Sequence, residues 1–538
     1  MNKTITFSLL FSVITVSSIQ AQSIEEVETA MKFEQYDVAK HDLYQLIKVE
    51  PNQGKHFFNL GSIHLKENQS DSAMIYFKQG LKATKNFNIN NIGIGQLSLN
   101  EGKDKEARSK FNAAQIRLPK NDIETYLLVS KAYIESTKPD PEKAMEAAKK
   151  AIKVNPKRVE GYIALGDAYM ADRSSKLATS AYREALEIDK TNPLAKIKIA
   201  NVFRFNNNYE DALKTLNEVV NEHPDYELVY KELAQTYAAY ARFSFDKTKN
   251  IQAVSNYAKF HSMIGESVDS DNAYADFLVK VRDFKGLETL MKDKWLSRGD
   301  NFKVYKYAAI SAYNNGKYDD AYTFITKYFD VQDKPQQIVG VDYLYLGLAE
   351  IEKAKKQDGT LDDAKYQLAV ANIKKGLDLD KDLASELYEH GLKLFKDEKY
   401  AQSYHLFNLG TTNKENENYV YDLYYKANAL YLTHNKPLFN NQLQTALSTL
   451  DELIKVSPST HEAYLLQARI NLLINTDASK MQAEKAYENF INLLKTKKLI
   501  NDKELQEAVK ESYTYIGVFN KDKNVEKAKV NLDKAAQL

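Results

Sequence analysis

A small side chain returns at a nearly fixed interval along this 538-residue chain. The unit is clearest in the stretch "GYIALGDAYMADRSSKLATSAYREALEIDKTNP" (161–193), where residues three and four positions apart form two sets. The sets are Tyr162, Leu165, Gly166 and Tyr169, and then Ala178, Tyr182 and Ala185. This spacing puts each set on one face of a helix. The pattern predicts two amphipathic helices that cross closely, with Gly166 and Ala178 as the small residues at the crossing.

The small residue that opens each second helix serves as an anchor for measuring the period. The anchors are Ala39, Ala73, Ala107, Ala144, Ala178, Ala212, Ala253, Leu287, Ala321, Ala369, Ser403, Ala446, Ala483 and Ala528. Successive anchors lie 34, 34, 37, 34, 34, 41, 34, 34, 48, 34, 43, 37 and 45 residues apart. Since no interval is shorter than 34, we interpret the longer ones as loop insertions into a single repeat. One helix pair cannot bury its apolar face alone, so the period predicts a stacked array.

The repeat resembles the tetratricopeptide repeat, whose pattern is W-x₂-L-G-x₂-Y, then A-x₃-F, then P. Residues 162–185 read Tyr-x₂-Leu-Gly-x₂-Tyr followed by Ala-x₃-Tyr, and residues 57–80 read Phe-x₂-Leu-Gly followed by Ala-x₃-Phe. A proline stands twelve residues beyond the anchor at Pro51, Pro119, Pro156, Pro224 and Pro458. The resemblance implies an all-α, right-handed superhelical solenoid of about 14 helix–turn–helix repeats. Tyr or Phe replaces the family's tryptophan, and Leu287 replaces a small anchor.

The first residues have the pattern of an export signal. Lys3 precedes a mostly apolar run over 5–16, and Ala21 ends a cleavage site before Gln22. We expect 1–21 to be a signal peptide, 22–332 an N-terminal array and 333–538 a C-terminal array with longer insertions. The boundary is placed in the longest insertion, between the anchors Ala321 and Ala369. The chain has no cysteine, so neither a disulfide nor a lipid-modified cysteine is expected.

The charge of the chain is balanced. Removal of residues 1–21 takes Lys3 with it, which leaves 73 basic residues against 73 acidic ones, interspersed throughout. A protein that neutralises phosphates needs a basic stripe, so nucleic acid is not an expected partner. No segment approaches the roughly 20 apolar residues of a membrane-spanning helix, so no direct membrane insertion is expected.

No motif for catalysis or cofactor binding stands out. The nine histidines are scattered, and neither an H-E-x-x-H motif, a phosphate-binding glycine loop nor a G-x-S-x-G elbow is present. The "NIGIGQ" stretch (91–96) falls at the small position of a first helix. Carboxylate pairs such as Asp319–Asp320 and Asp362–Asp363 stand at helix starts, where they cap backbone N–H groups. We therefore predict no catalytic residue, cofactor or metal, and a protein that is not an enzyme.

The remaining candidates for function are surface side chains. In the family that this chain resembles, the first helices line the concave side of the array. In that register the inward positions of the eleventh and twelfth repeats are aromatic-rich: Tyr388, Leu392, Phe395, Tyr421, Tyr424, Asn428 and Tyr431. Tyrosine clusters suit protein or peptide recognition, and these residues are our candidate partner-binding site. The alternative is that they pack the core or join two lobes.

The resemblance and the export signal together predict a non-enzymatic protein–protein interaction scaffold or adaptor in the bacterial periplasm. We expect its partners to be other envelope proteins, as an accessory subunit of an outer-membrane or secretion assembly. The alternative is a soluble binding module that holds a peptide or glycan in the concave groove. A groove whose tyrosines are free of the core would favour that alternative.

Overall fold

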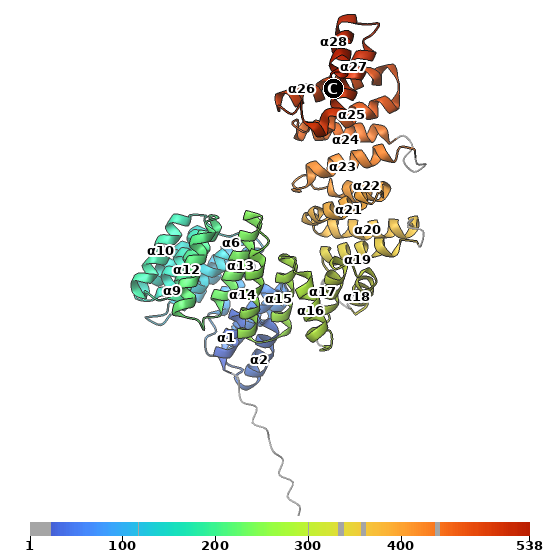
Figure 1. Ribbon diagram of the computed structural model, residues 1–538. Coiled ribbons are helices and arrows are strands. Elements are labelled where there is room, and N and C mark those ends of the chain that lie inside the picture. Colours follow the sequence, from blue (N-terminus) through green and yellow to red (C-terminus); the bar gives the residue numbers. More distant parts are fainter. Residues whose placement is uncertain (1–22, 117, 300, 332–337, 357–361, 436–441) are drawn as a thin grey trace, which may run out of the picture. The chain divides into compact units, whose positions relative to one another are not determined.

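The computed structural model describes residues 23–116, 118–299, 301–331, 338–356, 362–435 and 442–538. Within these residues the chain forms helices joined by short turns, with a single isolated bridge between Gln53 and Lys85. Figure 1 shows the helices stacked in consecutive pairs. The predicted signal peptide over 1–21 lies outside the described residues.

The chain forms two compact units. Unit 1 comprises residues up to Leu290 together with Arg298–Asn301, and unit 2 comprises Met291–Ser297 and Phe302–Leu538. The helices of unit 1 are α1 (Ile24–Lys32), α2 (Tyr36–Val49), α3 (Gly54–Lys66), α4 (Ser70–Gly80), α5 (Asn90–Asn100), α6 (Asp104–Ala114), α7 (Glu124–Ile134), α8 (Pro141–Val154), α9 (Val159–Ala171), α10 (Ser175–Ile188), α11 (Pro193–Phe205), α12 (Tyr209–Glu222), α13 (Leu228–Ser244), α14 (Lys249–Ile264), α15 (Val268–Lys280) and α16 (Phe284–Leu290).

Unit 2 continues the same alternation of first and second helices. Its helices are α17 (Val304–Asn314), α18 (Tyr318–Val331), α19 (Gly340–Lys353), α20 (Asp363–Leu379), α21 (Leu387–Lys396), α22 (Tyr400–Gly410), α23 (Tyr419–Leu432), α24 (Leu443–Val456), α25 (His461–Ile474), α26 (Asp477–Thr496), α27 (Gln506–Phe519) and α28 (Val525–Ala536). A π-helical turn, Met291–Trp295, precedes α17.

The predicted anchors all lie in second helices and are all buried. The most exposed, Ala528, shows 4% of its surface, and Leu287 is fully buried in spite of its size. Each anchor belongs to a different helix pair, from α2 to α28. The predicted all-α solenoid of helix pairs is confirmed.

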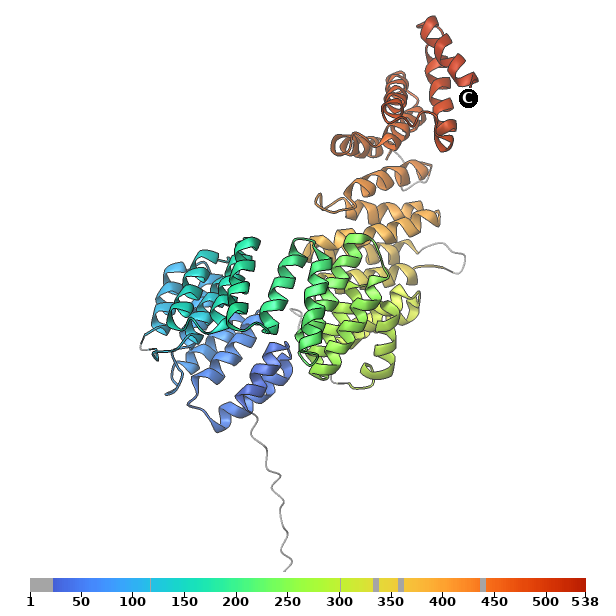
Figure 2. The ribbon, with the colours of Figure 1, turned by 60° about the vertical axis from the view of Figure 1, so that its left-hand side comes forward.

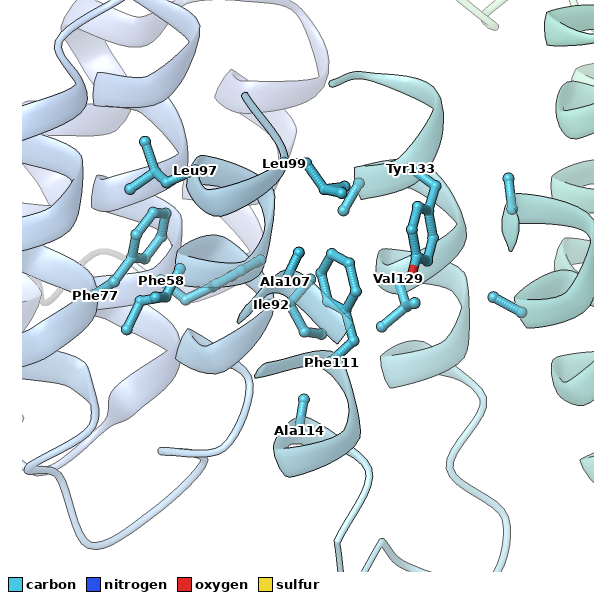
Figure 3. Packing of buried hydrophobic residues seen from close by; sticks show 14 of the residues in the cluster. Phe58, Phe77, Ile92, Leu97, Leu99, Ala107, Phe111, Ala114, Val129 and Tyr133 are labelled. Atoms are coloured by element: carbon cyan, nitrogen blue, oxygen red, sulfur yellow. The ribbon is translucent and has the colours of Figure 1, made fainter. Parts of the chain in front are cut away.

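In several pairs a small residue of the first helix contacts an aromatic ring of the second. A Cβ atom added to Gly166 in α9 would lie 2.2 Å from the ring of Tyr182 in α10, whose hydroxyl donates to Asp167 Oδ1 at 2.7 Å. Gly61 meets Phe77 and Gly95 meets Phe111 in the same way. Figure 3 shows Phe77 and Phe111 among the helices of the second to fourth repeats. The ring of Phe111 also contacts Tyr133 of the next first helix, with centroids 4.8 Å apart, so one ring packs both a pair and its neighbour.

In most repeats the turn between the two helices contains a residue in the left-handed conformation. The turn residues with positive φ are Glu34, Asn68, Gly102, Arg173, Asn207, Phe245, Arg282, Gly316, Glu398 and Asn475. Asparagine and glycine adopt this conformation readily, whereas glutamate, arginine and phenylalanine do so at a cost. The turn is therefore fixed by the geometry of the two packed helices rather than by a turn-forming residue at every position.

Unit 1 closes on itself, because its first repeat contacts its seventh and eighth. The backbone N–H of Asp37 in α2 donates to Asp269 Oδ2 in α15 at 2.8 Å, and the N–H of Val268 donates to Asp37 Oδ2 at 3.0 Å. Each aspartate thus caps the N-terminus of the other's helix. Gln35 Nε2 also donates to the carbonyl oxygen of Gly265 at 3.1 Å. In Figures 1 and 2, α1 and α2 (blue) lie beside the green helices of the same unit.

The division into units lies earlier in the chain than the boundary predicted at 332/333. The unit boundary falls between Leu290 and Phe302, where α16 is only seven residues long and a π-helical turn follows it. The longest insertion was expected to mark the boundary, whereas α18 and α19 on either side of 332–337 pack against each other within unit 2.

The interlock can be tested at Gly166. Gly166→Leu would drive a side chain into the ring of Tyr182, and we expect it to lower the free energy of unfolding by about 3 kcal/mol. The measurement is the urea midpoint followed by circular dichroism. Ser180→Leu, on the exposed face of the partner helix α10, adds a similar side chain and is expected to leave the midpoint nearly unchanged. Equal midpoints for the two variants would contradict the interlock.

The closure of unit 1 can be tested at Asp37. Asp37→Ala removes the acceptor for the Val268 N–H, a charge-assisted bond worth about 2 kcal/mol. We expect hydrogen exchange at the start of α15 to become about tenfold faster or more. Asp71 occupies the equivalent first turn of α4 and is exposed, so Asp71→Ala is the matched control and should not change exchange in α15. Unchanged exchange in the Asp37 variant would show that the closing contact does not form.

Candidate functional site

The first helices of unit 1 enclose a hollow of about 420 Å³. Its walls come from α1, α3, α5 and α7, the first helices of four successive repeats, and Tyr36 at the start of α2 also contributes. Much of the floor is apolar: Met31, Phe58, Ile63, Leu65, Ile92, Leu128 and Ala132. The resemblance implied that first helices line the binding side, and this hollow lies on those helices.

Asn59 is the polar group in the hollow that the fold does not satisfy. Its side chain is 5% exposed, and its Nδ2 has no hydrogen-bond partner. The neighbouring Ser62 on the same helix is satisfied, since its hydroxyl donates to the carbonyl oxygen of Phe58 at 2.8 Å. An unpaired buried amide costs the free protein about 1–3 kcal/mol. The Nδ2 atom is itself buried here, so a ligand carbonyl would reach it only after the Asn59 side chain turns toward the hollow.

The charged groups at the rim of the hollow largely neutralise one another. Lys66 pairs with Glu135 at 3.0 Å, and Lys131 lies 3.9 Å from the same carboxylate. Burial and the nearby Glu34 carboxylate raise the pKa of Tyr36 to about 12, so its phenol stays protonated at neutral pH. The site therefore suits a neutral, amide-bearing ligand with an apolar side chain.

Sequence reasoning missed Asn59. The signal was present in the run "FFNLGSIHL" (57–65), where an amide interrupts apolar residues on a predicted first helix. The repeat pattern explains the small and aromatic residues of that helix, but it gives no reason for an amide side chain among them.

The candidate residues of unit 2 lie on α21 and α23 and differ in exposure. Tyr421 exposes 55% of its surface, and the others are half-buried: Tyr388, Leu392, Phe395, Tyr424, Asn428 and Tyr431. The ring of Tyr388 lies 5.7 Å from that of Tyr421. Tyr424 and Tyr431 pack against the buried cluster formed by α23, α24 and α25. Their role in partner binding stays a prediction.

Tyr425 joins these rings and was not among the predicted residues. Its ring stacks on Phe407 at 5.2 Å and lies 5.0 Å from Phe395 and 6.2 Å from Tyr388. Burial raises the pKa of both Tyr388 and Tyr424 to about 12. The rings of Tyr388 and Phe395 thus pack against the repeat's own aromatic residues, while Tyr421 remains exposed.

A buried carboxyl group stands beside this cluster. Asp422 in α23 is fully buried, accepts from Asn416 Nδ2 at 2.8 Å and has no partner for Oδ1. Gly410 leaves room for it, since an added Cβ there would lie 2.4 Å from Asp422 Oδ2. Burial raises the pKa of Asp422 to about 8, in spite of the opposing Asn416 hydrogen bond. The folded protein therefore holds this carboxyl group protonated at neutral pH.

Asp422 makes stability depend on pH. Between about pH 4 and pH 8 the unfolded carboxyl group is ionised while the folded one keeps its proton, so stability falls as pH rises through this window. We expect Asp422→Asn to raise the urea midpoint at about pH 8.5 and to change it little at about pH 4. The exposed Asp397→Asn is the control, with no effect at either pH. The same change in midpoint at both pH values would show that Asp422 is ionised in the folded state.

The described part of the chain has neither a metal-binding cluster nor a membrane-spanning helix. It contains no group of three or more histidine or carboxylate side chains placed to hold a metal ion. None of its helices combines the length and apolar character that a membrane span requires.

Comparison with protein families gives three matches along unit 1. Models of the tetratricopeptide repeat match residues 57–87, 138–193 and 176–236. These ranges contain the interlocked pairs Gly61–Phe77 and Gly166–Tyr182. The chain is a tetratricopeptide-repeat protein. The predicted family is thus confirmed, and a tetratricopeptide-repeat (TPR) array indicates a protein–protein interaction scaffold. No curated protein matches the sequence.

Several solved structures are similar to this TPR protein at low identity. The C-terminal part of a TPR repeat-containing protein from Cytophaga hutchinsonii is 18% identical, with 49% of this chain and 94% of that chain covered and a TM-score of 0.36. A human IFIT1 dimer with PPP-AAAA is 16% identical over 58% of this chain and 72% of that chain, with a TM-score of 0.34. The Naa15/Naa10 structure bound to HypK-THB is 13% identical over 95% of this chain and 93% of that chain, with a TM-score of 0.35.

Proposed function

We propose that this TPR protein is a non-enzymatic scaffold that holds an extended segment of a partner protein in the hollow of unit 1. The observation that carries the proposal is the buried, unpaired amide of Asn59 in an apolar hollow. A peptide backbone offers a carbonyl acceptor for Asn59 Nδ2 and apolar side chains for the floor around Phe58 and Leu128. The balanced rim charge favours neither an acidic nor a basic segment at this position.

We further propose that the scaffold works in the bacterial periplasm, as an accessory subunit of an outer-membrane or secretion assembly. The export pattern over 1–21 supports this location. Its partners would then be other envelope proteins. N-terminal sequencing of the native protein tests the location, and a mature chain that begins at Gln22 in the periplasmic fraction is the expected result.

The partner proposal is tested by Asn59→Leu. Leucine has a similar size and removes an unsatisfied polar group, so we expect the free protein to melt at the same temperature as wild type or higher. The same change removes the donor for the partner's backbone, and we expect retention of the partner to fall about tenfold or more. The measurement combines thermal melting with affinity purification through a C-terminal tag after gentle detergent extraction of the envelope, and mass spectrometry of the copurified proteins.

Asn221→Leu provides the matched control, since Asn221 is exposed on α12. It should retain the partner at wild-type stoichiometry. Full retention of the partner by the Asn59 variant would contradict the proposed site. Purification of the wild-type protein alone would instead favour a diffusible peptide or glycan as the ligand, the alternative function predicted from the sequence.

A further inference from the structure

A second hollow of about 400 Å³ lies elsewhere in unit 1 and shares no residue with the one around Asn59. It is formed by the C-terminal ends of the first helices α13 and α15 and by the turn after α13. Alanine side chains of α13 and Val281 supply its apolar surface. The lining residues are Gln235, Ala238, Ala239, Ala241, Arg242, Phe245, Lys247, Asn250, Lys280, Val281 and Arg282.

This hollow depends on an insertion into the regular repeat. The anchors Ala212 and Ala253 are 41 residues apart, against 34 in most repeats. The extra residues lengthen α13 to 17 residues, whereas the first helices α9 and α11 have 13 each. Arg242, Phe245 and Lys247 all lie in this added stretch, so the repeat's own packing does not require them.

The charged residues that line the hollow are all basic. Arg242, Lys247 and Lys280 are exposed, and within the described residues none of them has a carboxylate at ion-pair distance. No acidic residue belongs to the lining, which also includes Arg282. Asp246, the acid next to Lys247 in sequence, is engaged by Lys249 at 2.6 Å, and this bond helps to lower its pKa to about 2. In a chain of balanced charge this is a local excess of positive charge around an apolar surface.

Phe245 is the second unusual feature of the site. Its side chain is 92% exposed, and its backbone is left-handed, with φ 54° and ψ 22°. Other turns of the array have asparagine, glycine or a charged residue at this position, so Phe245 is the aromatic residue among the left-handed turn residues of the described chain. A bulky aromatic residue in this conformation is disfavoured, and its exposed ring gains no burial in return. Phe245 thus destabilises the turn, while its exposed ring is available to contact a ligand.

We propose that this hollow is a docking site for a protein segment that carries acidic residues on both sides of an aromatic or aliphatic side chain. The apolar side chain fills the alanine-lined hollow beside Phe245, and the acidic residues pair with Arg242, Lys247 and Lys280. A concave site of this size fits a side chain better than the flat surface of a bilayer. The site is independent of the hollow around Asn59 and differs from it in charge.

The test is fluorescence anisotropy with the full-length mature protein and the labelled peptide Asp-Glu-Asp-Phe-Asp-Glu-Asp. We expect binding that weakens between about 0.02 M and about 0.2 M salt. The peptide with lysine and arginine in place of the acids should not bind, and the peptide with serine in place of phenylalanine should bind about tenfold more weakly.

Two variants separate binding from folding. The double variant Lys247→Glu/Lys280→Glu should raise the Kd of the acidic peptide about tenfold or more. Phe245→Asn should also weaken binding, and because asparagine suits the left-handed turn it should raise the melting temperature. The control Lys149→Glu/Lys153→Glu changes net charge equally on the exposed face of α8 and should leave the Kd unchanged.

The proposal is overturned if the acidic and basic peptides bind alike, or if the double variant at Lys247 and Lys280 keeps the wild-type Kd. Phosphatidylglycerol vesicles supply one more test. Vesicle binding that requires Lys247 and Lys280, together with no binding of the acidic peptide, would assign the site to a lipid surface instead. These outcomes are distinct from failure at Asn59, because the peptides and variants used at the two hollows differ.

Discussion

The structure depends on one repeated contact, a large side chain from a second helix set against a small residue of the first. That side chain is an aromatic ring at Phe77, Phe111, Tyr182 and Phe407 and an isoleucine at Ile373. At Gly166 the ring of Tyr182 leaves no room for even a methyl group. At Phe111 the same ring also reaches Tyr133 of the following repeat. Because one side chain serves two interfaces, the pairing of helices and the stacking of repeats are coupled, and the array propagates from neighbour to neighbour. The side chains that make this contact are buried between helices, so they cannot contact a partner.

Unit 1 adds a constraint that a simple stack lacks. The reciprocal caps of Asp37 and Asp269 join residues more than two hundred positions apart, and the rings of Phe33 and Phe260 meet at 6.1 Å nearby. A nearest-neighbour array would let its end repeats fray independently. Here the first repeat is held by the seventh and eighth, so the first helices around the Asn59 hollow are fixed from both sides.

The sequence was sufficient to predict the helix pairs, because the interlock leaves a small residue and a ring at a fixed spacing. It was not sufficient to predict the turns at Glu34, Arg173 and Glu398, since nothing in these side chains marks a left-handed backbone. Among the predicted site residues, Tyr388 and Phe395 meet Tyr425, a partner that the inward register does not include.

Function is best sought where the chain departs from what its packing needs. An interlocked repeat explains glycine, alanine and ring positions, but it has no use for the unpaired amide of Asn59 and gains nothing from Phe245 in an exposed left-handed turn. Both residues cost the free protein stability. Both also line hollows on first helices, one with balanced charge and one with excess positive charge. When a residue at a concave surface destabilises the free protein, the simplest reason for its presence is a partner whose contact with that residue restores the lost stability. The two hollows would therefore recognise chemically different segments, and one scaffold could hold both at once.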